Sequence, residues 1–137
     1  MRALIDTCII IDALQDRRPF ADDARAVFYA AADGLFDGYI TAKSTADIYY
    51  LTHRHTHSDK KTRDTLKKLC ALFEILDTAA ADCINAVDSC ISDYEDAIMA
   101  ESAARSGMDC IVTRNVSDYS LSKVPVYTPQ EFLAALG

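Results

Sequence analysis

Hydrophobic residues occur along this chain in two alternating patterns. Short, nearly unbroken apolar runs lie before Asp6 and at residues 38–42, 73–76, 109–113 and 124–127. Such runs are typical of strands that are covered on both faces. The last run contains Pro125, which has no amide donor for a central strand, so we expect it at an edge of the sheet.

Between these runs, apolar residues recur at helical spacing. The pattern predicts helices after Thr7, over 20–31, over 43–51, after Ser58-Asp59, over 79–91, over 93–105 and from Thr128 onwards. We expect Thr7, Asp93 and Thr128 to cap the helices that follow them, because their side-chain oxygens can accept hydrogen bonds from free amides.

Strands that alternate with helices predict an α/β fold with a central parallel sheet and right-handed connections. We expect a three-layer α/β/α architecture with about four to five strands. A length of 137 residues fits one domain over 1–137.

The net charge of −7 argues against adhesion to nucleic acid over the whole surface. The charge is uneven, however, since residues 53–68 carry +4 and the rest of the chain carries −11. Such a basic patch either binds a phosphate backbone or is only a solvated helix face.

Five cysteines, an odd number without any C-x-x-C pair, favour buried free thiols over disulfides or a zinc site. The N-terminus lacks the pattern of a signal peptide, and no apolar run approaches the ~20 residues of a membrane span. We therefore expect a cytoplasmic protein without a membrane partner.

Four aspartates lie where strands end or where neighbouring helices begin. Asp6 ends the first predicted strand, Asp47 lies in the helix after the second, Asp96 opens the helix before the fourth, and Asp118 follows the fourth. In a parallel sheet these positions share the carboxyl edge, where open α/β sheets bind ligands. Each acid alone could be a cap, a turn former or a surface residue.

Four carboxylates in one cleft repel one another unless cations lie between them. Oxygen ligands select hard divalent ions, Mg²⁺ or Mn²⁺, over zinc. Such ions can activate water for phosphodiester hydrolysis. The acids together therefore indicate a metal-dependent hydrolase of phosphodiesters.

Three segments resemble the PIN-domain ribonucleases, in particular the VapC-type toxins of toxin–antitoxin pairs. They are Leu4-Ile5-Asp6-Thr7-Cys8, Asp93-Tyr94-Glu95-Asp96-Ala97-Ile98 and Ile111-Val112-Thr113-Arg114-Asn115-Val116-Ser117-Asp118-Tyr119. The third is similar to the family's T-R-N-x-x-D-F segment and is the most specific. Residues 128–133 also look like the family's final helix, so the resemblance covers essentially the whole chain.

The resemblance implies a PIN-like fold and Mg²⁺- or Mn²⁺-dependent endonucleolytic cleavage of RNA. It implies a metal site of Asp6, Asp47, Asp96 and Asp118, with Thr113 and Asn115 beside it. We assign RNA contacts to four basic residues, Arg54, Lys60, Lys61 and Arg114. The expected partners are a cognate antitoxin, which would lay a segment with a basic side chain into the cleft, and a second copy of the chain in a homodimer.

Two departures from the family pattern bear on activity. Cys8 stands where the family usually has Asn, and Asp47 where it usually has Glu. The shorter side chain of Asp47 reaches about one bond less, so its metal contact could run through water. These departures keep open a catalytically weak PIN-like module that binds RNA or protein.

Other classes fit the residues less well. A haloacid-dehalogenase-like phosphatase needs a second Asp two residues after the first, where Cys8 stands. A receiver domain needs an acid pair before the first strand's end and a late lysine, neither of which is evident. A metal site at His53, His55 and His57 would need an extended segment, because alternate residues do not converge on a helix.

Overall fold

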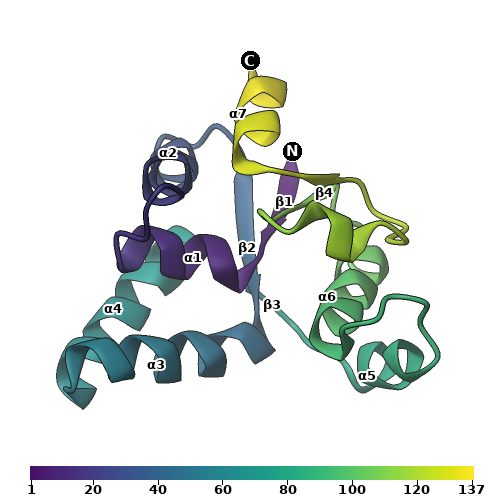
Figure 1. Cartoon of the computed structure of the whole chain (residues 1–137), viewed down its shortest axis with the longest axis horizontal. Helices are drawn as coiled ribbons and strands as arrows, with labels where there is room; N and C mark the ends of the chain where they lie inside the picture. The colour runs from purple at the N-terminus through teal and green to yellow at the C-terminus, as the bar shows by residue number, and fades with distance from the viewer.

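The computed structural model covers residues 1–137 and contains one five-stranded parallel sheet (Figure 1). The strands are β1 (Arg2–Ile5), β2 (Asp37–Thr41), β3 (Glu74–Leu76), β4 (Cys110–Val112) and β5 (Val126–Tyr127). Their order in the sheet is β3-β2-β1-β4-β5, and every neighbouring pair is parallel. The predicted parallel sheet is confirmed, and the Pro-containing segment supplies an edge strand.

Helices cover both faces of this sheet. They are α1 (Thr7–Leu14), α2 (Ala21–Ala32), α3 (Ala42–Thr56), α4 (Asp59–Leu72), α5 (Ala80–Val87), α6 (Tyr94–Arg105) and α7 (Pro129–Leu136), with a 3₁₀ helix η1 (Val116–Tyr119) after β4. In Figure 1, α1 to α4 lie on one side of the sheet, and α5 and α6 on the other. The expected three-layer α/β/α architecture is confirmed.

The alternation of side chains along β1 separates two hydrophobic cores. Ala3 and Ile5 pack with the apolar residues of α1, α2, α3, α4 and α7. Leu4 lies between them in sequence and packs with α5, α6 and Tyr119. All three residues are fully buried, which is why β1 reads as an unbroken apolar run.

Helix α3 is longer than its apolar pattern indicates. It continues through the His-Arg run to Thr56 and ends where His57 takes a left-handed conformation at φ 54°. His53, Arg54 and His55 lie in the last turn, where the helix dipole favours positive charge. The run therefore extends α3 instead of breaking it.

The helix predicted over residues 79–91 is shorter in the structure, and its larger apolar side chains lie on a different face from the buried one. Helix α5 ends at Val87, and Ile84 and Val87 are exposed. The buried face of α5 carries Asp82, which accepts from Nε and Nη2 of Arg105 at 2.8 and 3.1 Å and from Ser102 at 2.8 Å. This polar network adds to the apolar packing between α5 and α6, to which Ala86 of α5 contributes.

Two smaller expectations also need correction. Asp6, not Thr7, is the N-cap of α1, and its side chain makes no capping bond because it is engaged elsewhere. The five cysteines are free thiols, but only Cys110 is buried; Cys70 and Cys90 are exposed. Asp93 and Thr128 do cap their helices through side-chain oxygens.

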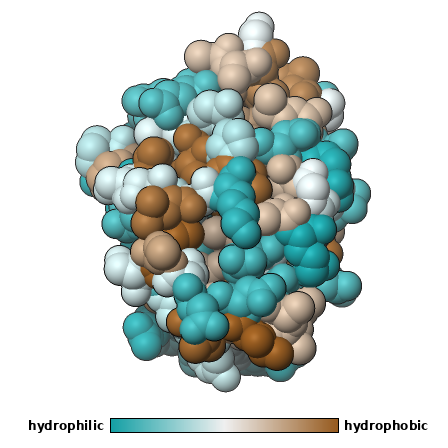
Figure 2. All heavy atoms as spheres, turned by 90° about the vertical axis from the view of Figure 1, so that its right-hand side faces the viewer, coloured by the Kyte–Doolittle hydropathy of each residue, from teal (hydrophilic) through white to brown (hydrophobic).

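The surface over α5 and α6 carries separate hydrophobic patches among hydrophilic side chains (Figure 2). Ile84 and Val87 of α5 are 68% and 70% exposed.

None of the helices combines the length and the apolar composition needed to cross a membrane.

Candidate active site

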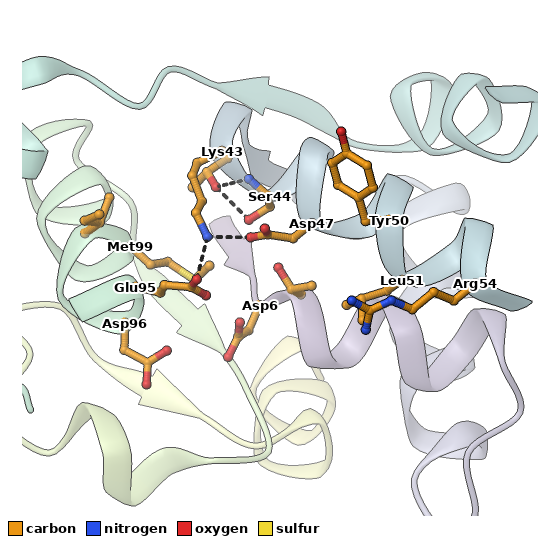
Figure 3. Close-up of a pocket in the computed structure, with 13 residues that line it drawn as sticks. Asp6, Lys43, Ser44, Asp47, Tyr50, Leu51, Arg54, Glu95, Asp96 and Met99 are labelled. Atoms are coloured by element: carbon orange, nitrogen blue, oxygen red, sulfur yellow. Dashed lines mark hydrogen bonds and ion pairs between the residues drawn. The ribbon is translucent and has the colours of Figure 1, made fainter. Parts of the chain in front are cut away.

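A cleft opens at the carboxyl edge of the sheet, close to the point where the connections diverge. Strands β2 and β3 lie on one side of β1 in the sheet, and β4 and β5, which come later in the chain, lie on the other side. Open α/β sheets bind ligands at such a switch point. The cleft has a volume of about 290 Å³, and its lining includes Asp6, Asp47, Arg54, Glu95 and Asp96 (Figure 3).

Asp6 follows β1 directly and is only 8% exposed. The hydroxyl of Thr113, which follows β4, donates to Asp6 Oδ2 over 2.8 Å. The amide of Asn115 in turn donates to the Thr113 hydroxyl oxygen over 3.1 Å, so this hydroxyl is held from both sides. Burial raises the pKa of Asp6, and the hydrogen bond from Thr113 opposes that shift.

Tyr119 joins Asp6 to Asp96. Its hydroxyl lies 3.0 Å from Asp96 Oδ1 and 3.4 Å from Asp6 Oδ2. The ring is 2% exposed, and Met99 Sδ also lies 3.4 Å from the hydroxyl. Two carboxylates from distant parts of the sequence therefore approach one buried hydroxyl group, which has a single proton to donate.

Asp96 lies in the first turn of α6, which Asp93 caps by accepting the Asp96 amide at 3.0 Å. The pKa of Asp96 is raised to about 6. Burial is the main cause; the Tyr119 hydrogen bond opposes it, and the negative charges of Asp6, Asp93 and Asp118 add to it. This crowding of negative charge is the kind that a bound cation relieves.

Asp47 lines the same cleft, but its carboxylate is already paired. Lys43 Nζ lies 2.6 Å from Asp47 Oδ2 and 3.0 Å from Glu95 Oε1. Lys43 and Asp47 belong to α3 and Glu95 to α6, so the ammonium group spans the cleft between these helices (Figure 3). Neither Lys43 nor Glu95 was among the site residues predicted from the sequence.

The remaining polar residues predicted for the site lie at its margin. Asp118 is exposed in η1 and does not line the cleft, although its charge is close enough to raise the pKa of Asp96. The Asn115 side chain is exposed too. Cys8 places Sγ 3.6 Å from the Thr113 hydroxyl.

The four basic residues are distributed unevenly around the cleft. Arg54 lines it, from the last turn of α3. Lys60 and Lys61 are exposed on α4 outside the lining, and Lys60 pairs with Asp64 at 3.2 Å. Arg114 does not line the cleft and instead pairs with the buried Asp12 at 2.7 Å.

The donor set of the cleft fits a hard divalent cation held by few protein ligands. Asp6 and Asp96 converge on Tyr119, but no group of three His, Cys, Asp or Glu side chains is already arranged to hold a metal ion. Mg²⁺ is often bound by only one or two carboxylates and keeps several waters. Asp6 and Asp96 are therefore the residues that would hold it, with water and substrate oxygens as the other ligands.

Tyr119 was likewise not predicted to be a site residue. It lies in the segment 111–119, directly after Asp118, but reads there as an ordinary core aromatic residue. A buried tyrosine normally satisfies its hydroxyl with a polar partner. A tyrosine within a segment of candidate ligands could thus have been identified as one that contacts them.

Comparison with known proteins identifies the family and the fold of the chain. The profile of the PIN domain matches residues 2–117. The chain is 14% identical to VapBC-1 from nontypeable Haemophilus influenzae, with TM-score 0.71 and coverage of 95% of this chain and 99% of that one. It is 20% identical to FitAcB from Neisseria gonorrhoeae, with TM-score 0.68 and coverage of 93% and 98%.

A toxin–antitoxin complex from Klebsiella pneumoniae is 23% identical, with TM-score 0.67 and coverage of 93% of this chain and 97% of that one. No match was found among curated protein sequences. At these identities the structural neighbours establish the fold, and the profile match establishes the family.

Proposed function

The chain belongs to the PIN domain family, and on this basis we propose that it is a metal-dependent endoribonuclease, the toxin of a type II toxin–antitoxin pair. The observation that carries the proposal is the meeting of Asp6 and Asp96 at the hydroxyl of Tyr119. Family membership supports a hydrolytic nuclease. The structural neighbours, which come from VapBC, FitAcB and toxin–antitoxin complexes, support the toxin assignment.

In this proposal Asp6 and Asp96 hold Mg²⁺ or Mn²⁺. A divalent cation bound there supplies a Lewis acid for the phosphodiester and lowers the pKa of water. Thr113 and Tyr119 fix the two carboxylates by their hydrogen bonds. Asp118, whose charge raises the pKa of Asp96, and the side chain of Asn115 would orient water around the pair in this proposal.

Arg54 supplies positive charge at the cleft itself, where an RNA phosphate could be bound. Lys60 and Lys61 extend this charge along α4 and would contact RNA outside the cleft. Arg114 contributes indirectly in this proposal: its ion pair with Asp12 holds the segment that carries Thr113 and Asn115. The substrate is RNA in this proposal, and the metal is Mg²⁺ or Mn²⁺.

The proposal is tested by incubating the purified protein with a mixture of RNAs in the presence of Mn²⁺. We expect cleavage that EDTA stops and that Asp6→Asn and Asp96→Asn abolish. Asp22→Asn, which alters an exposed ion pair of α2 outside the cleft, is the matched control and should cleave normally. Cleavage that persists in EDTA or in both site variants would remove the metal mechanism.

A second function is favoured by the pairing of Asp47 with Lys43, which leaves one acid fewer for metal binding. In that alternative the chain is a PIN-like module that binds RNA or protein with little or no turnover. Absence of cleavage of every RNA tested, with tight binding of a partner protein intact, would favour it.

We further propose two protein partners. A cognate antitoxin would lay a segment into the cleft and present a basic side chain to Asp6 and Asp96. A second copy would form a homodimer, for which Ile84 and Val87 offer exposed apolar surface. Co-purification with the product of the neighbouring gene tests the first, and light scattering of the purified chain tests the second.

A further inference from the structure

Lys43 occupies an unusual position for a surface lysine. Its ammonium group lies in the candidate active-site cleft and contacts carboxylates of two different helices, Asp47 at 2.6 Å and Glu95 at 3.0 Å. Glu95 is next to Asp96 in the first turn of α6. The ammonium therefore bridges two acids beside the Asp6–Asp96 pair, as Figure 3 shows.

The local structure explains how Lys43 reaches this point. Thr41 caps α3 directly after β2, which places Lys43 in the first turn at the carboxyl edge of the sheet. The amide of Lys43 donates to Thr78 Oγ1 over 3.3 Å. From there the flexible stem extends past Asp47, one turn further along the helix, towards α6.

The ion pairs of Lys43 contribute little to folding. The side chains of Lys43 and Asp47 are about one-third exposed, and that of Glu95 is 69% exposed. Ion pairs as exposed as these typically add little to the free energy of unfolding. Their importance is that they place a positive charge on two acids of the cleft, Asp47 and Glu95.

We propose that Lys43 fills the position of a second cation, so that the cleft holds one divalent ion, at Asp6 and Asp96, and not two. This inference rests on the proposed function, since it concerns the same site. An ammonium and a divalent ion repel each other and compete for the same carboxylate oxygens. While Lys43 is present, its ammonium occupies Asp47 Oδ2 and Glu95 Oε1, and its charge disfavours a second cation at these two acids.

The inference is tested by counting bound Mn²⁺ from the electron paramagnetic resonance of the free ion. The unaltered protein should bind one Mn²⁺ per chain. Lys43→Met keeps most of the stem, removes the charge and should bind two. Lys43→Met combined with Asp47→Asn should return to one, because the second site then loses a ligand.

Two controls separate charge from general disturbance. Lys43→Arg retains the positive charge and should bind one ion. Lys60→Met removes an exposed lysine that also pairs with an acid four residues on, Asp64, but outside the cleft, and should bind one ion too. Circular dichroism and the melting temperature verify that each variant is folded.

The results separate this inference from the proposed function. Two ions in the unaltered protein, or one ion in a folded Lys43→Met variant, would overturn the assignment of Lys43. If the unaltered protein binds one ion and cleaves RNA but Lys43→Met does not bind a second ion, the role given to Lys43 fails and the nuclease proposal stands. If the unaltered protein binds no ion and cleaves no RNA, the nuclease proposal fails with it.

Discussion

The guanidinium of Arg114 donates to both carboxylate oxygens of Asp12, over 2.7 Å from Nε and 3.3 Å from Nη2. Asp12 is completely buried in α1, and the Arg114 guanidinium carbon lies 4.4 Å from the centre of the Phe20 ring. The pair ties α1 to the segment after β4, on which Thr113 and Asn115 lie.

Breaking this ion pair should destabilise the fold. Arg114→Ala leaves the carboxylate of Asp12 buried without its partner, and we expect a loss of about 3 kcal/mol in the free energy of unfolding. Urea denaturation measures it. The double variant Arg114→Ala/Asp12→Asn has no unpaired buried charge, so it should recover part of the lost free energy of unfolding. Arg18→Ala, which breaks exposed pairs with Asp16 and Asp22, is the control and should cost far less.

Tyr119→Phe should weaken metal binding while the fold is kept. The change removes only the hydroxyl that orients Asp6 and Asp96, and loss of such a supporting hydrogen bond typically lowers metal affinity at least about tenfold. Titration with Mn²⁺ measures the affinity. Tyr29→Phe, at a tyrosine that is 67% exposed, should leave it unchanged. Equal affinities in all three proteins would show that Tyr119 does not organise the site.

Asp96→Asn should stabilise the metal-free protein at pH 7.5. Because the pKa of Asp96 in the folded protein is raised to about 6, the folded state favours the protonated carboxyl. Its contribution to stability is therefore present at low pH and is lost as the pH rises through about 6. Asn is neutral throughout, so the advantage of the variant should disappear near pH 4.

Thermal unfolding with EDTA over this pH range measures the effect. Asp93→Asn is unsuitable as a control because Asp93 caps α6, whereas Asp22→Asn alters only an exposed ion pair. A lower melting temperature for metal-free Asp96→Asn at pH 7.5 would contradict the unfavourable burial and charge crowding of Asp96.

Asp82→Asn should destabilise the protein at neutral pH, in contrast to the stabilisation expected for Asp96→Asn. Burial alone would raise the pKa of Asp82, but Arg105, the Ala79 amide and Ser102 outweigh it and lower the pKa. The stabilisation is then present at neutral pH and is lost as the pH falls through the acid range. We expect the variant to be less stable at pH 7 and the difference to shrink towards pH 3, measured by urea denaturation at each pH.

The sequence predicts the sheet and part of the site because both depend on local patterns. Unbroken apolar runs mark β1 and β4, and the strand that ends at Asp6 fixes where this acid lies. The Asp93 cap likewise places Asp96 in the first turn of α6. The direction of parallel strands then brings the two acids to one edge.

The partners of these residues could not be predicted in the same way. The pairs Thr113–Asp6 and Arg114–Asp12 join positions more than a hundred residues apart, and they form because β1 and β4 are neighbours in the sheet. Apolar periodicity does not specify strand order. It also does not reveal that α5 directs Asp82, not Ile84 or Val87, towards α6.

Anomalous diffraction from crystals grown with Mn²⁺ would show directly whether Asp6 and Asp96 share one divalent cation. We expect a manganese peak within coordinating distance of carboxylate oxygens of both Asp6 and Asp96. Diffraction that shows the ion elsewhere, or no peak between these two side chains at saturating Mn²⁺, would contradict it.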